Sequence, residues 1–180
     1  MSPRPDKHEN WLTVAHTIAA RGTCKRRRVG CVLVDDRNCI LSTGFNGPGP
    51  GQPHCIDQPC AGANFASGQG LGECEAIHAE QNALLTCQDI FTIAHVYTTT
   101  APCKHCTKML LRTSAQAIYF IDDYVDSGQE LWERAGRRWI MYSNSQIELL
   151  RYFSVADHRV HGGITTIQAN MLAESLVRVE

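Results

Sequence analysis

The stretches His78-Ala79-Glu80 and Pro102-Cys103-Lys104-His105-Cys106 decide how the rest of this chain can be read. One imidazole and two thiolates can bind a metal ion, while the carboxylate of Glu80 is left over as a group that need not be a ligand. Three protein ligands with an open fourth position are typical of a catalytic zinc site, whereas structural zinc sites are usually closed. We therefore predict a catalytic zinc bound by His78, Cys103 and Cys106.

Both stretches are predicted to lie at helix starts. The apolar residues and good helix formers that follow predict a helix beginning near His78, and Pro102 fits the first turn of a second helix. His78 and Glu80 would stand about 200° apart around a helix, so they can converge only at its N-terminal tip. Cys103 and Cys106 would share one side of a first turn, where the helix dipole favours thiolates.

One histidine and two cysteines that bind a metal ion, beside a glutamate that does not, are the signature of zinc-dependent nucleobase deaminases. In that chemistry zinc lowers the pKa of a water molecule, Glu80 takes its proton, the hydroxide attacks the amine-bearing carbon and ammonia leaves. We predict that Glu80 is both general acid and general base. The alternative is a zinc-stabilised module, but such a module gives no reason for a free carboxylate beside the ligands.

Composition limits the class of protein. The 180 residues are 43% hydrophobic, which is enough for one domain with a sizeable core. No apolar run approaches the ~20 residues that span a bilayer and the polar start has no signal-peptide character, so we expect a cytoplasmic protein without membrane contact. Nine cysteines, an odd number, fit zinc in a reducing compartment better than disulfides. The net charge of −1 argues against a nucleic-acid partner.

A run of four cations, Lys25-Arg26-Arg27-Arg28, follows a predicted helix at Trp11 to Ala20 and precedes a predicted strand at Val29 to Val34. The run is either a solvated turn or a contact for the phosphate of a small anionic ligand. A second strand at residues 39–44 completes a hairpin. Within this hairpin, Cys31 and Cys39 are expected to be small core residues.

Residues 49–72 are rich in Gly, Pro, Asn and Ser, and a loop of this length in a small domain is usually functional or tied down. Further along, predicted strands at 94–99 and 117–121 flank the cysteine helix, which implies a crossover between parallel strands. A helix at 130–136 and a fifth strand at 138–142 follow. We predict an α/β protein with three α/β/α layers and a five-stranded mixed sheet, in which residues 1–145 are the catalytic domain and 146–180, with a helix at 146–153, are its C-terminal extension.

Three motifs together resemble the deoxycytidylate (dCMP) deaminase family of the cytidine deaminase superfamily, over roughly residues 10–145. They are Gly44-Phe45-Asn46-Gly47, His78-Ala79-Glu80-Gln81-Asn82-Ala83 and Pro102-Cys103-x-x-Cys106. The resemblance implies a cytidine deaminase-like fold and hydrolysis of dCMP to dUMP and ammonia in pyrimidine deoxynucleotide supply. It also implies a second, structural zinc, as in phage and bacterial members, with Cys24, Cys55, Cys60 and Cys74 as its candidate ligands and His54 as a possible substitute.

The same resemblance implies substrate contacts. Asn46 would contact the sugar or base, the backbone N–H of Ala79 the pyrimidine carbonyl, the Ala101 carbonyl the leaving amine, and Tyr124 the nucleotide near its phosphate. Candidates for phosphate or effector contact are Arg26, Arg28, Phe45 and Gly47. Members of the family form homo-oligomers, often hexamers, and dCTP and dTTP are possible effectors. Asp89 stands where some phage-type relatives have Arg, which leaves regulation open.

Several alternatives stay open or are weakened by the motifs. The substrate could be dCTP or a 5-modified dCMP, because pocket volume cannot be read from one sequence. A tRNA adenosine deaminase shares both zinc motifs but is expected to lack Gly-Phe-Asn-Gly and the four further cysteines and to have a wider basic surface. A riboflavin-pathway deaminase would have a longer spacing between its cysteines.

Overall fold

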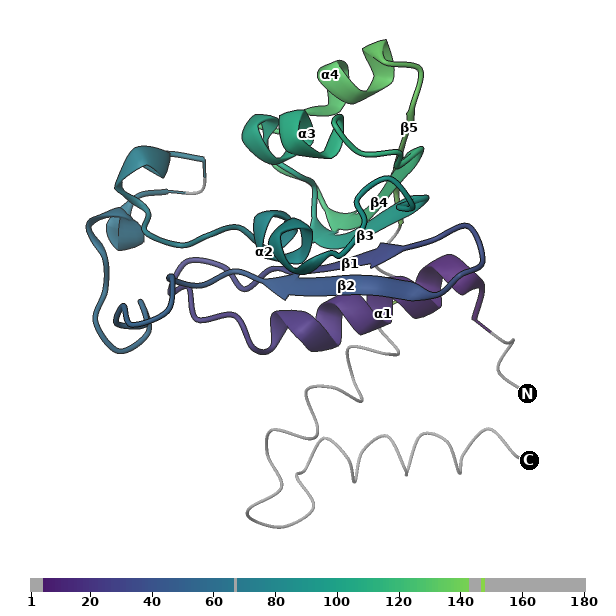
Figure 1. Ribbon diagram of the computed structural model, residues 1–180. Coiled ribbons are helices and arrows are strands. Elements are labelled where there is room, and N and C mark those ends of the chain that lie inside the picture. The colour runs from purple at the N-terminus through teal and green to yellow at the C-terminus, as the bar shows by residue number, and fades with distance from the viewer. Residues whose placement is uncertain (1–4, 67, 143–146, 148–180) are drawn as a thin grey trace, which may run out of the picture.

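A five-stranded sheet lies between helices on both faces in the computed structural model, which describes residues 5–66, 68–142 and 147 (Figure 1). Helix α1 (Lys7–Ala19) covers one face, and α2 (Ala79–Thr86), α3 (Lys104–Leu110) and α4 (Gln129–Arg134) cover the other. The strands are β1 (Gly30–Val34), β2 (Ile40–Phe45), β3 (His95–Thr100), β4 (Ala117–Asp122) and β5 (Arg138–Met141). The predicted three-layer α/β/α fold is confirmed.

The strand order is β2-β1-β3-β4-β5, and the sheet is mixed. Strand β1 pairs antiparallel with β2 and β3, whereas β3, β4 and β5 are mutually parallel. The predicted crossover between parallel strands is therefore confirmed. In this register Thr100 pairs with Asp122, so the carboxyl ends of β3 and β4 meet at one edge of the sheet. Ligands of open α/β sheets bind at that edge, and the segments leading to Cys103 and Tyr124 begin there.

Each face of the sheet carries its own apolar core. Strand β1 is buried at all five positions because helices cover both of its faces, as is typical of a central strand. On one face Leu12 and Ala15 of α1 pack against Val32, Tyr97 and their neighbours. On the other face Ala79 and Ala83 of α2 pack in a cluster that includes Leu33, Val96 and Trp132.

Two glycines allow a helix to approach the sheet closely on each face. A Cβ at Gly30 would collide with the carbonyl of Ala15 in α1, and a Cβ at Gly44 would collide with the Ala79 carbonyl and the Ala83 nitrogen in α2. Neither contact could be relieved by a side-chain movement because the atoms belong to helix backbone. The contact at Gly44 fixes the start of α2 directly over β2, and His78 and Glu80 are placed with it.

Two helix starts differ from those predicted. Helix α1 begins at Lys7 instead of Trp11, because Asp6 and Glu9 form a capping box in which Asp6 accepts from the backbone N–H of Glu9 at 2.8 Å and Glu9 accepts from that of Asp6 at 2.9 Å. Helix α3 begins at Lys104 with Cys103 as its N-cap. Pro102 thus precedes the helix and does not lie in its first turn.

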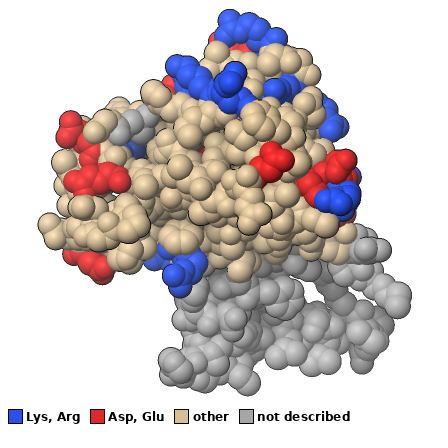
Figure 2. Space-filling model, in the orientation of Figure 1, with Lys and Arg blue, Asp and Glu red and all other residues tan. Residues whose placement is uncertain are grey.

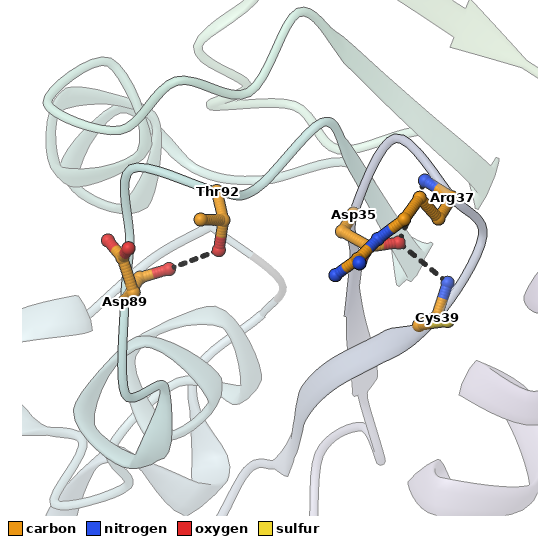
Figure 3. A network of polar contacts seen from close by, with 5 residues as sticks. All are labelled: Asp35, Arg37, Cys39, Asp89 and Thr92. Carbon is orange, nitrogen blue, oxygen red and sulfur yellow. Dashed lines mark hydrogen bonds and ion pairs between the residues drawn. The ribbon is translucent and has the colours of Figure 1, made fainter.

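The prediction that Cys39 is a core residue is wrong, although Cys31 is fully buried. Cys39 is exposed because it belongs to the turn before β2, where Asn38 has a positive φ of 62°. Asp35 holds this turn, since its Oδ1 accepts from the backbone N–H of Arg37 at 2.9 Å and of Cys39 at 2.7 Å (Figure 3). Turn chemistry therefore outweighs the apolar character of the cysteine.

The predicted helix at 146–153 and the predicted extension 146–180 lie outside the described residues, apart from the buried Ile147. The five predicted strands lie within one or two residues of their observed bounds. Within the part of the chain that the structure covers, no helix combines the length and the apolar character needed to cross a bilayer.

Candidate active site and metal centre

The three predicted zinc ligands converge between the N-termini of α2 and α3. His78 is the N-cap of α2, Cys103 is the N-cap of α3 and Cys106 lies in the first turn of α3. The Nδ1 atom of His78 lies 3.5 Å from the Sγ of Cys103 and 3.4 Å from the Sγ of Cys106. All three donor atoms lie within 4.8 Å of one another.

These side chains fit a zinc ion by distance and by chemistry. Zinc–sulfur and zinc–nitrogen bonds of about 2.3 and 2.0–2.1 Å at tetrahedral angles place sulfur about 3.6 Å from nitrogen, close to both observed separations. A hydrogen bond from Cys106 lowers the pKa of Cys103 to about 4, and the same bond raises the pKa of Cys106. The low pKa of Cys103 favours its thiolate, which is the form that binds zinc.

Glu80 lies beside the ligands and is not one of the three converging groups. It is the second residue of α2, and its side chain is almost fully buried, with 4% of the residue exposed. Burial raises the pKa of Glu80, and the neighbouring His78 partly offsets the rise. A buried carboxylate with a raised pKa is suited to accepting and returning a proton near neutral pH.

A cavity of about 300 Å³ opens onto Glu80, His78 and Cys103. Of the residues predicted to contact substrate, Asn46, Ala101, Tyr124 and Arg26 line it. Ala79 is fully buried at the start of α2 and is absent from the lining. The cavity therefore gathers most of the predicted substrate residues around the predicted catalytic group.

Five lining residues were not predicted as site residues: Arg27, Val29, Phe65, Ala76 and Thr100. The Nη1 of Arg27 donates to the Thr100 hydroxyl at 3.4 Å, and Thr100 ends β3 just before the residues that lead to Cys103. Phe65 is 46% exposed although it is aromatic. The basic run had indicated Arg27 as a possible phosphate contact. Nothing in the sequence indicated that the Phe65 side chain would face the cavity.

Three other candidates for phosphate or effector contact do not line this cavity. Arg28 lines an adjoining open groove together with Lys25 and Ile56, and Cys24, Arg26 and Arg27 line both this groove and the cavity. Phe45 has the guanidinium of Arg21 at 5.8 Å from its ring centre. Gly47 forms a backbone bridge with Ile77. Any role of these residues would therefore be exercised outside the main cavity.

The four further cysteines lie in two contacting pairs. The sulfurs of Cys55 and Cys60 are 3.8 Å apart, the spacing of about 3.8 Å expected for two thiolates on one tetrahedral zinc. A hydrogen bond from Cys74 lowers the pKa of Cys24 to about 5. Among the residues that the structure describes, however, three donors within 4.8 Å of one another occur only at the first site. The second zinc stays a prediction, and His54 instead contacts the Thr23 hydroxyl at 3.1 Å.

Surface charge is unevenly distributed on the face shown in Figure 2. Lys and Arg gather over the end formed by α3 and α4, and the middle of this face, over α2, carries little charge. Three large apolar side chains on or near α2 and α3 are exposed: Leu85 by 72%, Phe91 by 68% and Met109 by 39%.

Comparison with known proteins identifies relatives of this chain. The sequence profile described as "Cytidine and deoxycytidylate deaminase zinc-binding region" matches residues 5–122. ComE operon protein 2 of Bacillus subtilis is 32% identical over 134 residues, which are 72% of this chain and 67% of that protein. Deoxycytidylate deaminase of Mycobacterium phage D29 is 34% identical over 124 residues, 65% of this chain and 95% of that protein. The fission yeast deoxycytidylate deaminase is 34% identical over 125 residues, 67% of this chain and only 38% of its own length.

The fold is also that of a solved structure. The dCMP deaminase of cyanophage S-TIM5 in its apo form superposes with a TM-score of 0.61 at 24% identity, covering 77% of this chain and 99% of that one. The same phage protein has been solved in complex with dCMP and dUMP. At this identity the superposition establishes the shared fold.

Proposed function

Because the chain belongs to the cytidine and deoxycytidylate deaminase family of zinc-dependent hydrolases, we propose that it converts dCMP to dUMP and ammonia. The observation that carries the proposal is the cavity lined by the buried Glu80 with His78 and Cys103, because Arg26 and Arg27 line the same cavity. Glu80, His78 and Cys103 suit the hydrolytic removal of an amino group from a nucleobase. The two arginines suit an anionic group on the same small molecule.

In the proposed reaction, His78, Cys103 and Cys106 would hold a zinc ion, which would supply the Lewis acidity that makes water a nucleophile near neutral pH. Glu80 accepts a proton from the attacking water at a carboxylate oxygen, and the water oxygen bonds to C4 of cytosine. Glu80 then donates that proton to the ring nitrogen N3, where it stays, and transfers the remaining proton of the hydroxyl group now on C4 to the amine, so that C4=O forms as the C4–N bond breaks. The carbonyl of Ala101, in the cavity wall, accepts from the departing ammonia.

Phosphate recognition is assigned to Arg26 and Arg27. Arg27 lines the cavity and donates to Thr100, and Arg26 lines it while donating to the carbonyls of Gly62 at 3.2 Å and Ala66 at 2.9 Å. Each guanidinium has five N–H donors, so both retain donors for a phosphate. Two prearranged guanidinium groups favour a nucleotide over a nucleoside.

Replacing Arg26 and Arg27 together by Gln should raise KM for dCMP by about ten- to hundredfold, because a hydrogen bond between charged groups contributes about 1.5–3 kcal/mol. Deoxycytidine, which lacks the phosphate, should be a poor substrate for both proteins. Steady-state ammonia release measures both constants. Arg28→Gln is the matched control because Arg28 does not line the cavity. A double variant whose KM for dCMP stays at the wild-type value would assign the run to a solvated turn.

One assay separates the candidate substrates. Ammonia release compared across dCMP, dCTP, CMP and 5-methyl-dCMP should be fastest with dCMP. A thermal-shift comparison of deoxycytidine nucleotides with an RNA hairpin adds an independent readout, since a ligand that binds the native state raises its melting temperature. Stabilisation by RNA alone would reject the nucleotide proposal in favour of a tRNA deaminase.

The proposal includes a second, structural zinc on Cys24, Cys55, Cys60 and Cys74, supported by the tetrahedral spacing of Cys55 and Cys60. Four thiolates would give a closed site with a net charge of −2, which does not activate water. Such a site would pin the glycine-rich segment before α2, which buries little apolar area of its own.

The protein is also proposed to form a homo-oligomer, with a hexamer as the expected form and dCTP and dTTP as effectors. The exposed Leu85, Phe91 and Met109 support a protein contact at α2 and α3. Light scattering should give a particle mass six times the 20.0 kDa chain mass. Leu85→Lys with Phe91→Lys should lower that mass, because burying unpaired charges opposes association. A wild-type particle of single-chain mass would contradict this assignment.

A further inference from the structure

All four polar groups of Asn46 bind the segment that contains the basic run. Its backbone N–H donates to the Val29 carbonyl at 3.1 Å, and its backbone carbonyl accepts from the N–H of Thr23 at 3.1 Å. Its side-chain Oδ1 accepts from the N–H of Val29 at 2.8 Å, and its Nδ2 donates to the Arg27 carbonyl at 2.8 Å. We propose that Asn46 is a positioning residue, which holds residues 24–28 in the shape that presents Arg26 and Arg27 to the cavity.

An amide is the side chain that these contacts require. One side must donate to the carbonyl of Arg27 while the other accepts from the N–H of Val29, and a carboxylate of the same shape offers only acceptors. Asn46 is 7% exposed, and a Cβ on Gly22 would stand 2.7 Å from its Oδ1. The side chain therefore has little room to turn away from the basic segment.

The effect of this clamp extends across the cavity wall. The Asn46 side chain binds backbone atoms of Arg27 and of Val29, the residue that directly follows the basic run. Arg27 in turn donates to Thr100 at the end of β3, and Arg26 donates to the carbonyls of residues 62 and 66, which flank the lining residue Phe65. Asn46 thus connects the Gly-Phe-Asn-Gly segment with the two arginines and, through Arg26, with the loop that contains residues 62 and 66.

This inference rests on the proposed function and can be distinguished from a direct contact between Asn46 and the sugar. If Asn46 acts through the arginines, its replacement should harm only the substrate that carries a phosphate. If it binds the sugar directly, dCMP and deoxycytidine should suffer equally, because both contain the same sugar. Amide exchange at Val29 in the ligand-free protein gives a third readout, since that N–H is hydrogen-bonded to the Asn46 side chain.

The test is Asn46→Asp, which preserves shape and removes the donor. We expect KM for dCMP to rise at least about tenfold and amide exchange of Val29 to accelerate at least about tenfold, since the variant loses one hydrogen bond and sets two oxygens against each other. kcat/KM for deoxycytidine should fall by a much smaller factor than kcat/KM for dCMP, because deoxycytidine has no phosphate for the arginines to bind. Asn82→Asp is the matched control, because the Asn82 amide donates to the Phe45 carbonyl at 2.7 Å and does not contact the basic segment. It should leave exchange at Val29 unchanged.

Equal losses on dCMP and deoxycytidine, with exchange at Val29 unchanged, would overturn the proposal. Gly22→Ala serves as a second variant if Asn46→Asp does not fold, because its methyl group would stand 2.7 Å from the Asn46 Oδ1, nearer than to the Ala19 carbonyl at 3.0 Å or the Arg28 Cβ at 3.1 Å. It should reproduce the selective rise in KM, and wild-type values of KM and of exchange in the folded variant would also overturn the proposal. If the wild-type protein deaminates no cytosine nucleotide, the proposed function fails, and the exchange measurement still decides the clamp.

Discussion

The Glu80→Gln variant should fold and bind zinc like the wild-type protein but release ammonia from dCMP about 10²- to 10⁴-fold more slowly. The glutamine keeps the size and one acceptor of the buried side chain, so the start of α2 remains intact. It cannot take up a proton at the position where the carboxylate serves several successive transfers. Steady-state ammonia release, zinc analysis and the melting temperature together measure the effect.

Glu130→Gln is a matched control for this loss, because Glu130 is also the second residue of a helix, α4, but is exposed. It should retain wild-type turnover. Turnover above about a tenth of wild type in Glu80→Gln would reject the assigned role, since a positioned acid and base is worth at least about a hundredfold.

Loss of a zinc ligand should have an effect of similar size but a different cause. Cys103→Ser should lose one zinc per chain and all measurable turnover, because a serine hydroxyl stays protonated and cannot replace the thiolate whose pKa is about 4. Cys55→Ser should lose the other zinc and chiefly lower the melting temperature. Metal analysis and thermal unfolding of both variants measure these outcomes.

Cys87→Ser controls for cysteine replacement as such, since Cys87 is half-buried after α2 and its sulfur contacts the Asp89 carbonyl at 3.5 Å. It should bind zinc and turn over normally. A fully active wild-type protein with one zinc per chain, together with an unchanged melting temperature in Cys55→Ser, would eliminate the second site and leave the first intact.

The metal centre was predictable because few residue types bind zinc and because both halves of the motif lie at helix starts. His78 and Cys103 are the N-caps of α2 and α3, where local sequence signals are strong. The capping box of Asp6 and Glu9 was also present in the sequence. The helix start was nevertheless predicted at Trp11, four residues too late, because the apolar pattern begins there. Local rules were sufficient wherever the determining contacts lie within a few residues.

Contacts between distant loops could not be predicted in the same way. Arg26 binds carbonyls of residues 62 and 66, and Phe65 lines the cavity, only because two irregular segments meet in space. Neither helical nor strand periodicity applies to such segments, so the facing direction of each side chain is set by tertiary contacts. For this reason Arg28 lines only the adjoining open groove, whereas its neighbours Arg26 and Arg27 line both that groove and the cavity.

The contact of Gly44 with α2 has a consequence for anyone who would redesign this protein. No residue of β2 lines the cavity, and a side chain at position 44 would disturb the catalytic group, because even a methyl group there would push on the Ala79 carbonyl, one residue before Glu80. Variation is easier in the loop that carries Phe65, a cavity-lining residue that is 46% exposed. Libraries that aim to change which base is accepted should therefore keep the strand constant and diversify the loop.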